Sequence, residues 1–182
     1  MIVVTAPAAQ PTSASQPPAF LTASGHHYRS AQLATKDQLR ISADHLAGLA
    51  AECAIKAILL DYLGSRLNEK QRPFSPDLMI PQQRPVNGVK PKKQDRKEYS
   101  HEHLPELWGQ LSTIASRRRG RETGPLFMQL IQQNPFHDWD VGGRYCDDTN
   151  ISDADLTRHL QAARDLLAAH QQAITLGTGT LA

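Results

Sequence analysis

The sequence has little cysteine, few aromatic residues and no apolar run long enough to span a membrane. Only two cysteines, Cys53 and Cys146, occur among 182 residues. Two are too few for a disulfide framework, so we expect free thiols and a reducing compartment. Aromatic residues make up 5% of the chain, while Ala and Leu are abundant, and this composition favours helix packing over sandwiches or barrels. These scarcities predict an all-α protein.

Signals for membranes or export are also missing. No segment reaches the roughly 20 apolar residues that a membrane-spanning helix needs. The apolar start, residues 1–4, lacks the basic region of a signal peptide and runs into a stretch rich in Pro, Ala and Ser. We therefore expect a cytoplasmic protein with no membrane partner. The net charge of +2 is too small to indicate nucleic-acid binding by itself.

The length suits one domain with flexible ends. Residues 1–19 carry four prolines among small and polar residues, which predicts a flexible tail. A single helical domain is expected over residues 20–176, followed by a frayed end at 177–182. Within this domain, residues 65–99 contain five prolines and a basic run at 90–97. A connection of this length is usually functional or disordered, and we interpret it as an insertion loop.

The spacing of apolar residues predicts an up-and-down bundle of four to five helices. The expected helices cover residues 27–38, 41–63, a segment from Ser100 as N-cap to Gly120, residues 125–133, and a segment opened by a capping box at Ser152–Asp155. The second of these is distinctive, because almost every residue from Leu46 to Leu60 is apolar or small. A helix that is apolar all round is surrounded by other helices, so we expect it at the centre of the bundle.

Polar residues form one stripe on this central helix. At about 100° per residue, His45, Glu52 and Lys56 lie along the same side. Glu52 and Lys56 are four residues apart, which is also the spacing of a simple surface ion pair worth a few tenths of a kcal/mol. The stripe is therefore either part of a functional site or an ordinary helix-surface pair.

Three short fragments carry a family resemblance. They are Ala-Glu-Cys-Ala-Ile-Lys-Ala at 51–57, His103-Leu104, and Arg144-Tyr145 followed by a polar gap and Ser152. Their order and spacing resemble the HEPN domain, a family of small helical bundles associated with RNA and nucleotides. The resemblance spans roughly residues 28–172. It implies a homodimer of a defence or toxin–antitoxin type, in some branches with a nucleotidyltransferase as protein partner, and no cofactor. Within these fragments we take Glu52, Lys56, His103, Arg144 and Tyr145 as candidates for binding RNA, a nucleotide or a protein partner.

Some HEPN proteins are metal-independent ribonucleases that use an Arg followed, after four to six residues, by a His. This spacing occurs here as Arg40–His45 and as Arg96–His101, and Arg96 also stands six residues before His103. In such chemistry His transfers protons and Arg stabilises charge on the phosphate. We take Arg40 and His45 as catalytic candidates, because Arg96 lies in the insertion. Five residues along a straight helix are about 140° apart, so this pair requires a bend or a dimer mate. The alternative is an exposed Arg and a helix-face His.

Two further features leave alternatives open. Arg144 and Tyr145, near Trp139, either pack the loop onto the bundle or present a cation to a phosphate. The histidines and aspartates at 101–103 and 137–140 lack the helix-borne pair of a zinc site, so no metal is expected.

The leading functional hypothesis is therefore an RNA-directed module, with metal-independent endoribonuclease activity as its enzymatic form. The alternatives are a non-catalytic nucleotide- or protein-binding module and a purely structural dimeric subunit.

Overall fold

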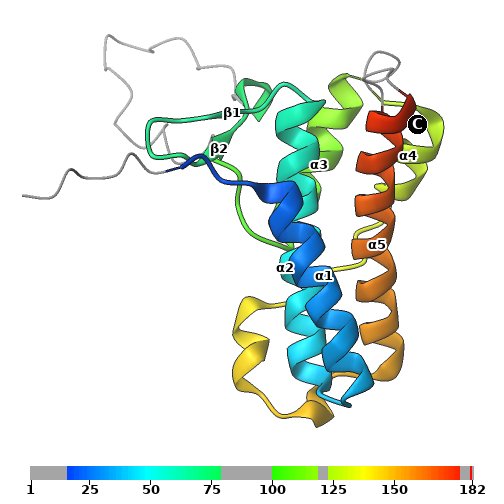
Figure 1. The fold of residues 1–182 in the computed structure, drawn as a ribbon. Helices are drawn as coiled ribbons and strands as arrows, with labels where there is room; N and C mark the ends of the chain where they lie inside the picture. The colour runs from blue at the N-terminus through cyan, green and yellow to red at the C-terminus, as the bar shows by residue number, and fades with distance from the viewer. Residues whose placement is uncertain (1–15, 79–99, 119–122, 177–180, 182) are drawn as a thin grey trace, which may run out of the picture.

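Three long helices form the body of the molecule, and two short ones close one end (Figure 1). The computed structural model describes residues 16–78, 100–118, 123–176 and 181. The long helices are α1 (Phe20–Lys36), α2 (Arg40–Asp61) and α5 (Asp153–Leu176), and the short ones are α3 (Glu106–Arg117) and α4 (Pro125–Leu130). The only strands in these ranges form one antiparallel hairpin, β1 (Arg66–Leu67) with β2 (Pro73–Phe74). The predicted all-α class is confirmed.

Helix α2 occupies the centre of the fold, as its composition predicts. It packs against α1, α3 and α5, and its side chains are buried along most of its length. Alanines at several of its contact positions are fully buried, and their small side chains let neighbouring helices approach closely. Ser24 of α1, itself buried, donates a hydrogen bond to the Ala50 carbonyl at 2.7 Å. This packing leaves α2 little access to water.

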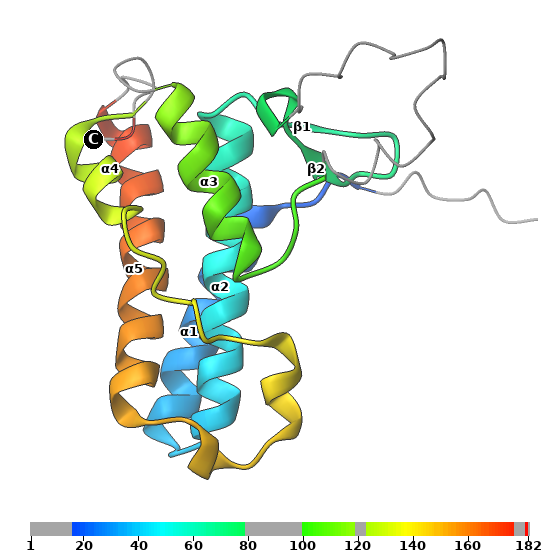
Figure 2. The ribbon, with the colours of Figure 1, turned by 180° about the vertical axis from the view of Figure 1, so that it is seen from behind.

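The helix directions differ from a strict up-and-down order. α1 and α2 are antiparallel, but α2 and α5 run in the same direction (Figures 1 and 2). Ion pairs join successive residues of these two helices in the same order: Arg40 with Asp153, Asp44 with His159, and Asp61 with His170. The reason is the irregular segment 131–152, here named the return segment. It carries the chain back along the bundle before α5 begins.

Several helix boundaries also differ from those predicted. The first helix begins earlier, at Phe20, and the third begins at Glu106. The predicted N-cap at Ser100 is wrong, because Ser100 forms a β-bridge with Phe74 and is held extended beside the hairpin. The capping role of Ser152 is confirmed, since its Oγ accepts a hydrogen bond from the Asp155 backbone N–H at 3.1 Å.

Other predictions fall partly outside the described residues. Most of the N-terminal tail, residues 79–99 of the insertion with Arg96, and most of the C-terminal end lie there. The described part of the insertion contains the hairpin and a 3₁₀ turn, Pro76–Leu78. Both cysteines are free thiols, as predicted. None of the helices seen in the described ranges is long and apolar enough to cross a membrane.

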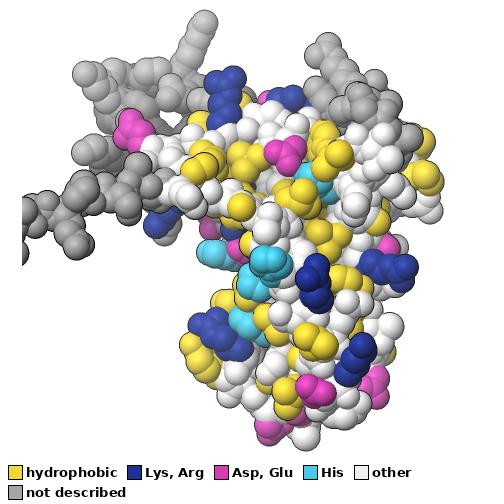
Figure 3. Space-filling model, viewed as in Figure 1, with side chains coloured by type: hydrophobic (Ala, Val, Ile, Leu, Met, Phe, Trp, Pro, Cys, Tyr) yellow, Lys and Arg dark blue, Asp and Glu magenta, His cyan; other side chains and the backbone are white. Residues whose placement is uncertain are grey.

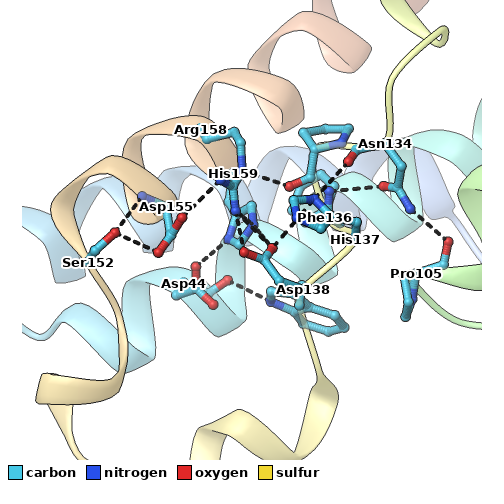
Figure 4. Close-up of polar contacts among 12 residues, drawn as sticks. Asp44, Pro105, Asn134, Phe136, His137, Asp138, Ser152, Asp155, Arg158 and His159 are labelled. Carbon is cyan, nitrogen blue, oxygen red and sulfur yellow. Dashed lines mark hydrogen bonds and ion pairs between the residues drawn. The ribbon is translucent and has the colours of Figure 1, made fainter.

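A partly buried polar network fastens the return segment to α2 and α5 (Figure 4). The His159 ring lies between two carboxylates, with Nδ1 2.6 Å from Asp44 and Nε2 3.3 Å from Asp138. Arg158 contacts both oxygens of Asp138, at 2.8 and 2.6 Å, and donates to the Pro135 carbonyl at 2.9 Å. Asp44 and His159 are both buried. Each is the hydrogen-bonding partner of the other, and a buried charge or polar group without such a partner would destabilise the fold.

Gly48 provides the notch in which the return segment meets α2. The buried Trp139 ring lies over Gly48 and donates from Nε1 to the Asp44 carbonyl at 3.3 Å. A Cβ atom added at Gly48 would lie 2.1 Å from a ring carbon of Trp139, closer than real contacts allow. The absence of a side chain at this position therefore determines where the return segment docks.

We expect Gly48→Ala to lower the free energy of unfolding by about 1–3 kcal/mol, because the indole has to move out of its contact. Gly109→Ala is the matched control: Gly109 also lies in a helix, and a Cβ there meets nothing within 4 Å. The control should gain up to about 1 kcal/mol from helix propensity. Urea denaturation of both variants measures the difference, and equal stability of the two would contradict the notch.

Candidate functional site

Glu52 is the centre of a cluster that connects α2 with the segment before α3. Its carboxylate is buried, with 7% of the residue exposed. It accepts a hydrogen bond from Lys56 Nζ at 2.6 Å. On its other side, His103 Nδ1 lies 2.9 and 3.1 Å from the two carboxylate oxygens. The structure thus brings together three of the five residues that the sequence predicts for binding.

His103 presents one ring nitrogen to solvent. A carboxylate only accepts hydrogen bonds, so the Nδ1 facing Glu52 is the donor. In the neutral ring this leaves Nε2 as an acceptor. The side chain of His103 is 74% exposed, and Nε2 has no partner among the described residues. A carboxylate that fixes the tautomer and orientation of an exposed imidazole is the arrangement used to prepare a histidine for proton transfer.

Lys56 is the buried ion-pair partner of Glu52. Only 8% of the residue is exposed, and its Nζ lies 5.9 Å from the centre of the Phe20 ring of α1. The i, i+4 pair is therefore not the surface ion pair that its spacing also allows. Removing one partner of a buried pair leaves an uncompensated charge and costs about 3–5 kcal/mol. Lys56 accordingly neutralises and holds Glu52, while His103 is the member that reaches solvent.

The segment that carries His103 is held on both sides. Preceding it, the buried His101 ring lies 2.9 Å from Ser65 Oγ through Nε2 and 3.3 Å from Gln110 Oε1 through Nδ1. Following it, Leu104 is buried in the core. His101 and Leu104 therefore hold the segment against the bundle on both sides of His103, whose own side chain is exposed. Sequence reasoning did not identify the contacts of His101, because Ser65 is 36 residues away.

The predicted catalytic pair, Arg40 and His45, is not brought together. Arg40 Nη2 lies 2.5 Å from Asp153 at the start of α5. The His45 ring stacks on Trp139, with centroids 6.0 Å apart and planes 12° apart. Each side chain is thus engaged by a different segment. Because α2 continues without a break from Arg40 to Asp61, the side chains of Arg40 and His45 project from the helix about 140° apart, as their spacing predicts.

His45 lies in a cationic environment. Burial lowers its pKa, and the nearby Arg144 guanidinium lowers it further, while Asp44 raises it by a smaller effect. Its Nδ1 is buried and has no hydrogen-bond partner. Figure 3 shows histidine side chains close together on this face of the molecule, with a basic side chain beside them.

Arg144 and Tyr145 form an exposed pair in the return segment, within the 3₁₀ helix η4 (Val141–Tyr145). Arg144 donates to the Val141 carbonyl at 2.9 Å and to the Tyr145 hydroxyl at 2.7 Å, and its guanidinium lies 4.5 Å from the centre of the Tyr145 ring. Tyr145 is 79% exposed. Trp139 packs the loop onto the bundle. Arg144 and Tyr145 face solvent instead, which agrees with the second interpretation, a cation open to a phosphate.

Comparisons with known proteins add no assignment. No group of three His, Cys, Asp or Glu residues that could hold a metal ion occurs in the part of the chain that the structure describes. No family model, no curated protein and no solved structure matches this chain.

The buried His101 should make stability depend on pH. Burial lowers the pKa of His101 from 6.5 to about 4, against a smaller increase from the contact with Gln110, and the Lys56 charge adds a still smaller decrease. The folded pKa lies below the unfolded value, so between these values the unfolded chain binds the proton and the folded chain does not. The full contribution is present above pH 6.5 and is lost as the pH falls toward 4, by about 2–3 kcal/mol.

Urea denaturation between pH 4 and pH 7 tests this dependence. His101→Gln should flatten the profile, because it removes the titrating group. The control His137→Ala alters a histidine whose side chain is 65% exposed and should retain the slope. A His101→Gln profile parallel to that of the unchanged protein would show that another group is responsible.

Proposed function

We propose that this protein is an RNA-directed, HEPN-like enzyme that cleaves RNA without a metal ion, with His103 as its proton-transferring residue and Glu52 as the residue that orients it. The single observation that supports this is the contact of His103 Nδ1 with the buried Glu52 carboxylate, which leaves the exposed Nε2 as a proton acceptor. The sequence resemblance supports RNA as the substrate, a homodimeric state, and a role in a defence or toxin–antitoxin system, with a nucleotidyltransferase as a candidate partner.

In the proposed reaction, His103 Nε2 removes the proton from a ribose 2′-hydroxyl. The 2′-oxygen attacks the adjacent phosphorus, and the bond from phosphorus to the 5′-oxygen breaks. The products are a 2′,3′-cyclic phosphate and a 5′-hydroxyl, whose oxygen takes its proton from water, and the imidazolium of His103 releases its proton to the solvent before the next turnover. Glu52 stabilises the positive imidazolium that forms on His103. Lys56 compensates the Glu52 charge between turnovers, which allows the carboxylate to remain buried.

Arg40 and His45 are the alternative catalytic residues within the same function. Because Arg40 is paired with Asp153 in the single chain, this alternative requires an Arg from a dimer mate. His45 variants are therefore included in the test.

A binding module without cleavage is the second candidate function. It is favoured by the exposed Arg144–Tyr145 pair, whose cation and ring both face solvent.

Cleavage of mixed cellular RNA in EDTA is the test. We expect the unchanged protein and His137→Ala to cleave, and His103→Ala to lose at least about a hundredfold in rate, the lower range for loss of a general base. Because His103 is exposed, this variant should fold normally, which circular dichroism will verify. Glu52→Gln should lower the rate and change its pH profile, since the amide no longer stabilises the imidazolium. Because this change leaves Lys56 without its buried partner, circular dichroism also verifies that this variant is folded.

The other outcomes are equally informative. Loss of cleavage in His45→Ala with full activity in His103→Ala would overturn the assignment and favour the Arg40–His45 alternative. Intact RNA with every form of the protein would reject the enzyme and leave the binding module.

A further inference from the structure

The Arg144–Tyr145 pair has the construction of a stacking platform. The guanidinium covers one face of the Tyr145 ring at 4.5 Å, and its two hydrogen bonds, to Val141 and to the Tyr145 hydroxyl, fix both side chains relative to η4. With 79% of Tyr145 exposed, the opposite ring face remains open to solvent. An aromatic ring that already has a hydrogen-bonded neighbour loses less conformational entropy than a free one when a second flat group stacks on it.

Arg144 also lacks a counter-ion. It has no carboxylate partner among the described residues, and the aspartates in the surrounding sequence already have partners. Asp140 accepts from the Gly142 backbone N–H, Asp147 from Thr149, and Asp148 from the Ile41 backbone N–H at 2.7 Å. Two of the five guanidinium N–H donors bind within η4, and the remaining ones suit the oxygens of a phosphate.

The platform follows an anchored point of the return segment. Trp139 docks the return segment at Gly48 and stacks on His45, and Arg144 is close enough to lower the His45 pKa. From His45 to Glu52 the axis of α2 advances about 10 Å, at about 1.5 Å per residue. The platform thus lies near His45, and His45 and Glu52 lie on the same side of α2, about 10 Å apart along its axis.

We propose that Tyr145 and Arg144 bind one unpaired nucleotide of a single-stranded RNA, with its base stacked on the open face of Tyr145 and its phosphate on Arg144. This inference rests on the proposed function and names its substrate class. Bases in a duplex are already stacked on both faces and have none to offer. An aromatic face beside a cation is the arrangement that proteins use to hold unpaired bases without reading their sequence.

Binding is measured separately from cleavage, with the full chain carrying His103→Ala. The probes are a fluorescein-labelled single-stranded oligoadenylate and a duplex RNA of the same length, followed by fluorescence anisotropy. Tyr145→Ala should weaken single-strand binding about tenfold or more, because a stacked base is lost, and change duplex binding less than twofold. Tyr145→Phe keeps the ring and should lose less than Tyr145→Ala.

The cation has its own control. Arg144→Gln should weaken single-strand binding and lower its dependence on salt, since one phosphate contact is lost. Arg164→Gln removes an exposed cation of α5 and should leave both unchanged. All altered side chains are on the surface, so the variants should fold normally.

Three results would overturn the inference: no binding of the single strand, unchanged affinity in both Tyr145→Ala and Arg144→Gln, or equal losses for single strand and duplex. Failure of the proposed reaction would appear differently, as intact RNA with every form of the protein or as cleavage that does not depend on His103. In the second case the labelled strands are made of 2′-O-methyl nucleotides, which cannot be cleaved through the 2′-oxygen and still report binding.

Discussion

A helix enclosed by its neighbours must find a partner within the protein for every charge it carries, and this constraint organises the whole structure. Helix α2 carries Asp44, Glu52 and Lys56 in its buried stretch. Asp44 is satisfied by His159 of α5, and Glu52 by Lys56 and by His103. Because buried charges are costly without such contacts, these partners are fixed in place. One of these interactions holds the bundle together, and the other creates the exposed, oriented imidazole of the candidate site.

The return segment determines where the Arg144–Tyr145 pair lies on the molecule. A short connection from α4 directly into α5 would have placed α5 antiparallel to α2. Instead, residues 131–152 run back along the bundle and dock through Trp139 at Gly48. Asp138, adjacent to Trp139, binds His159 and Arg158, so packing and charge hold the same point. The exposed Arg144–Tyr145 pair follows a few residues later. Its position beside His45 is therefore a consequence of how the segment is anchored.

Much of the helical framework could be predicted from the sequence. The apolar run of residues 46–60 indicates a central helix, and the structure places α2 there, because a helix without a polar face has no side to turn toward water. The capping box at Ser152 also gives the start of α5 correctly. Ser100 misled the prediction, since a local capping pattern cannot reveal that the β-bridge to Phe74 holds this residue extended. The parallel direction of α2 and α5 has no local signal at all.

In the candidate site, too, some features could be predicted from the sequence and others could not. The sequence by itself determined that Glu52 and Lys56 are one turn apart on a buried helix, because helical periodicity is a local property. Only the tertiary structure decided that His103, 51 residues away, meets Glu52, and that Arg40 and His45 are engaged by Asp153 and Trp139 instead of by each other. The physical reason is that hydrogen bonds and ion pairs between distant segments depend on how the helices pack, and spacing along the chain contains no record of that packing.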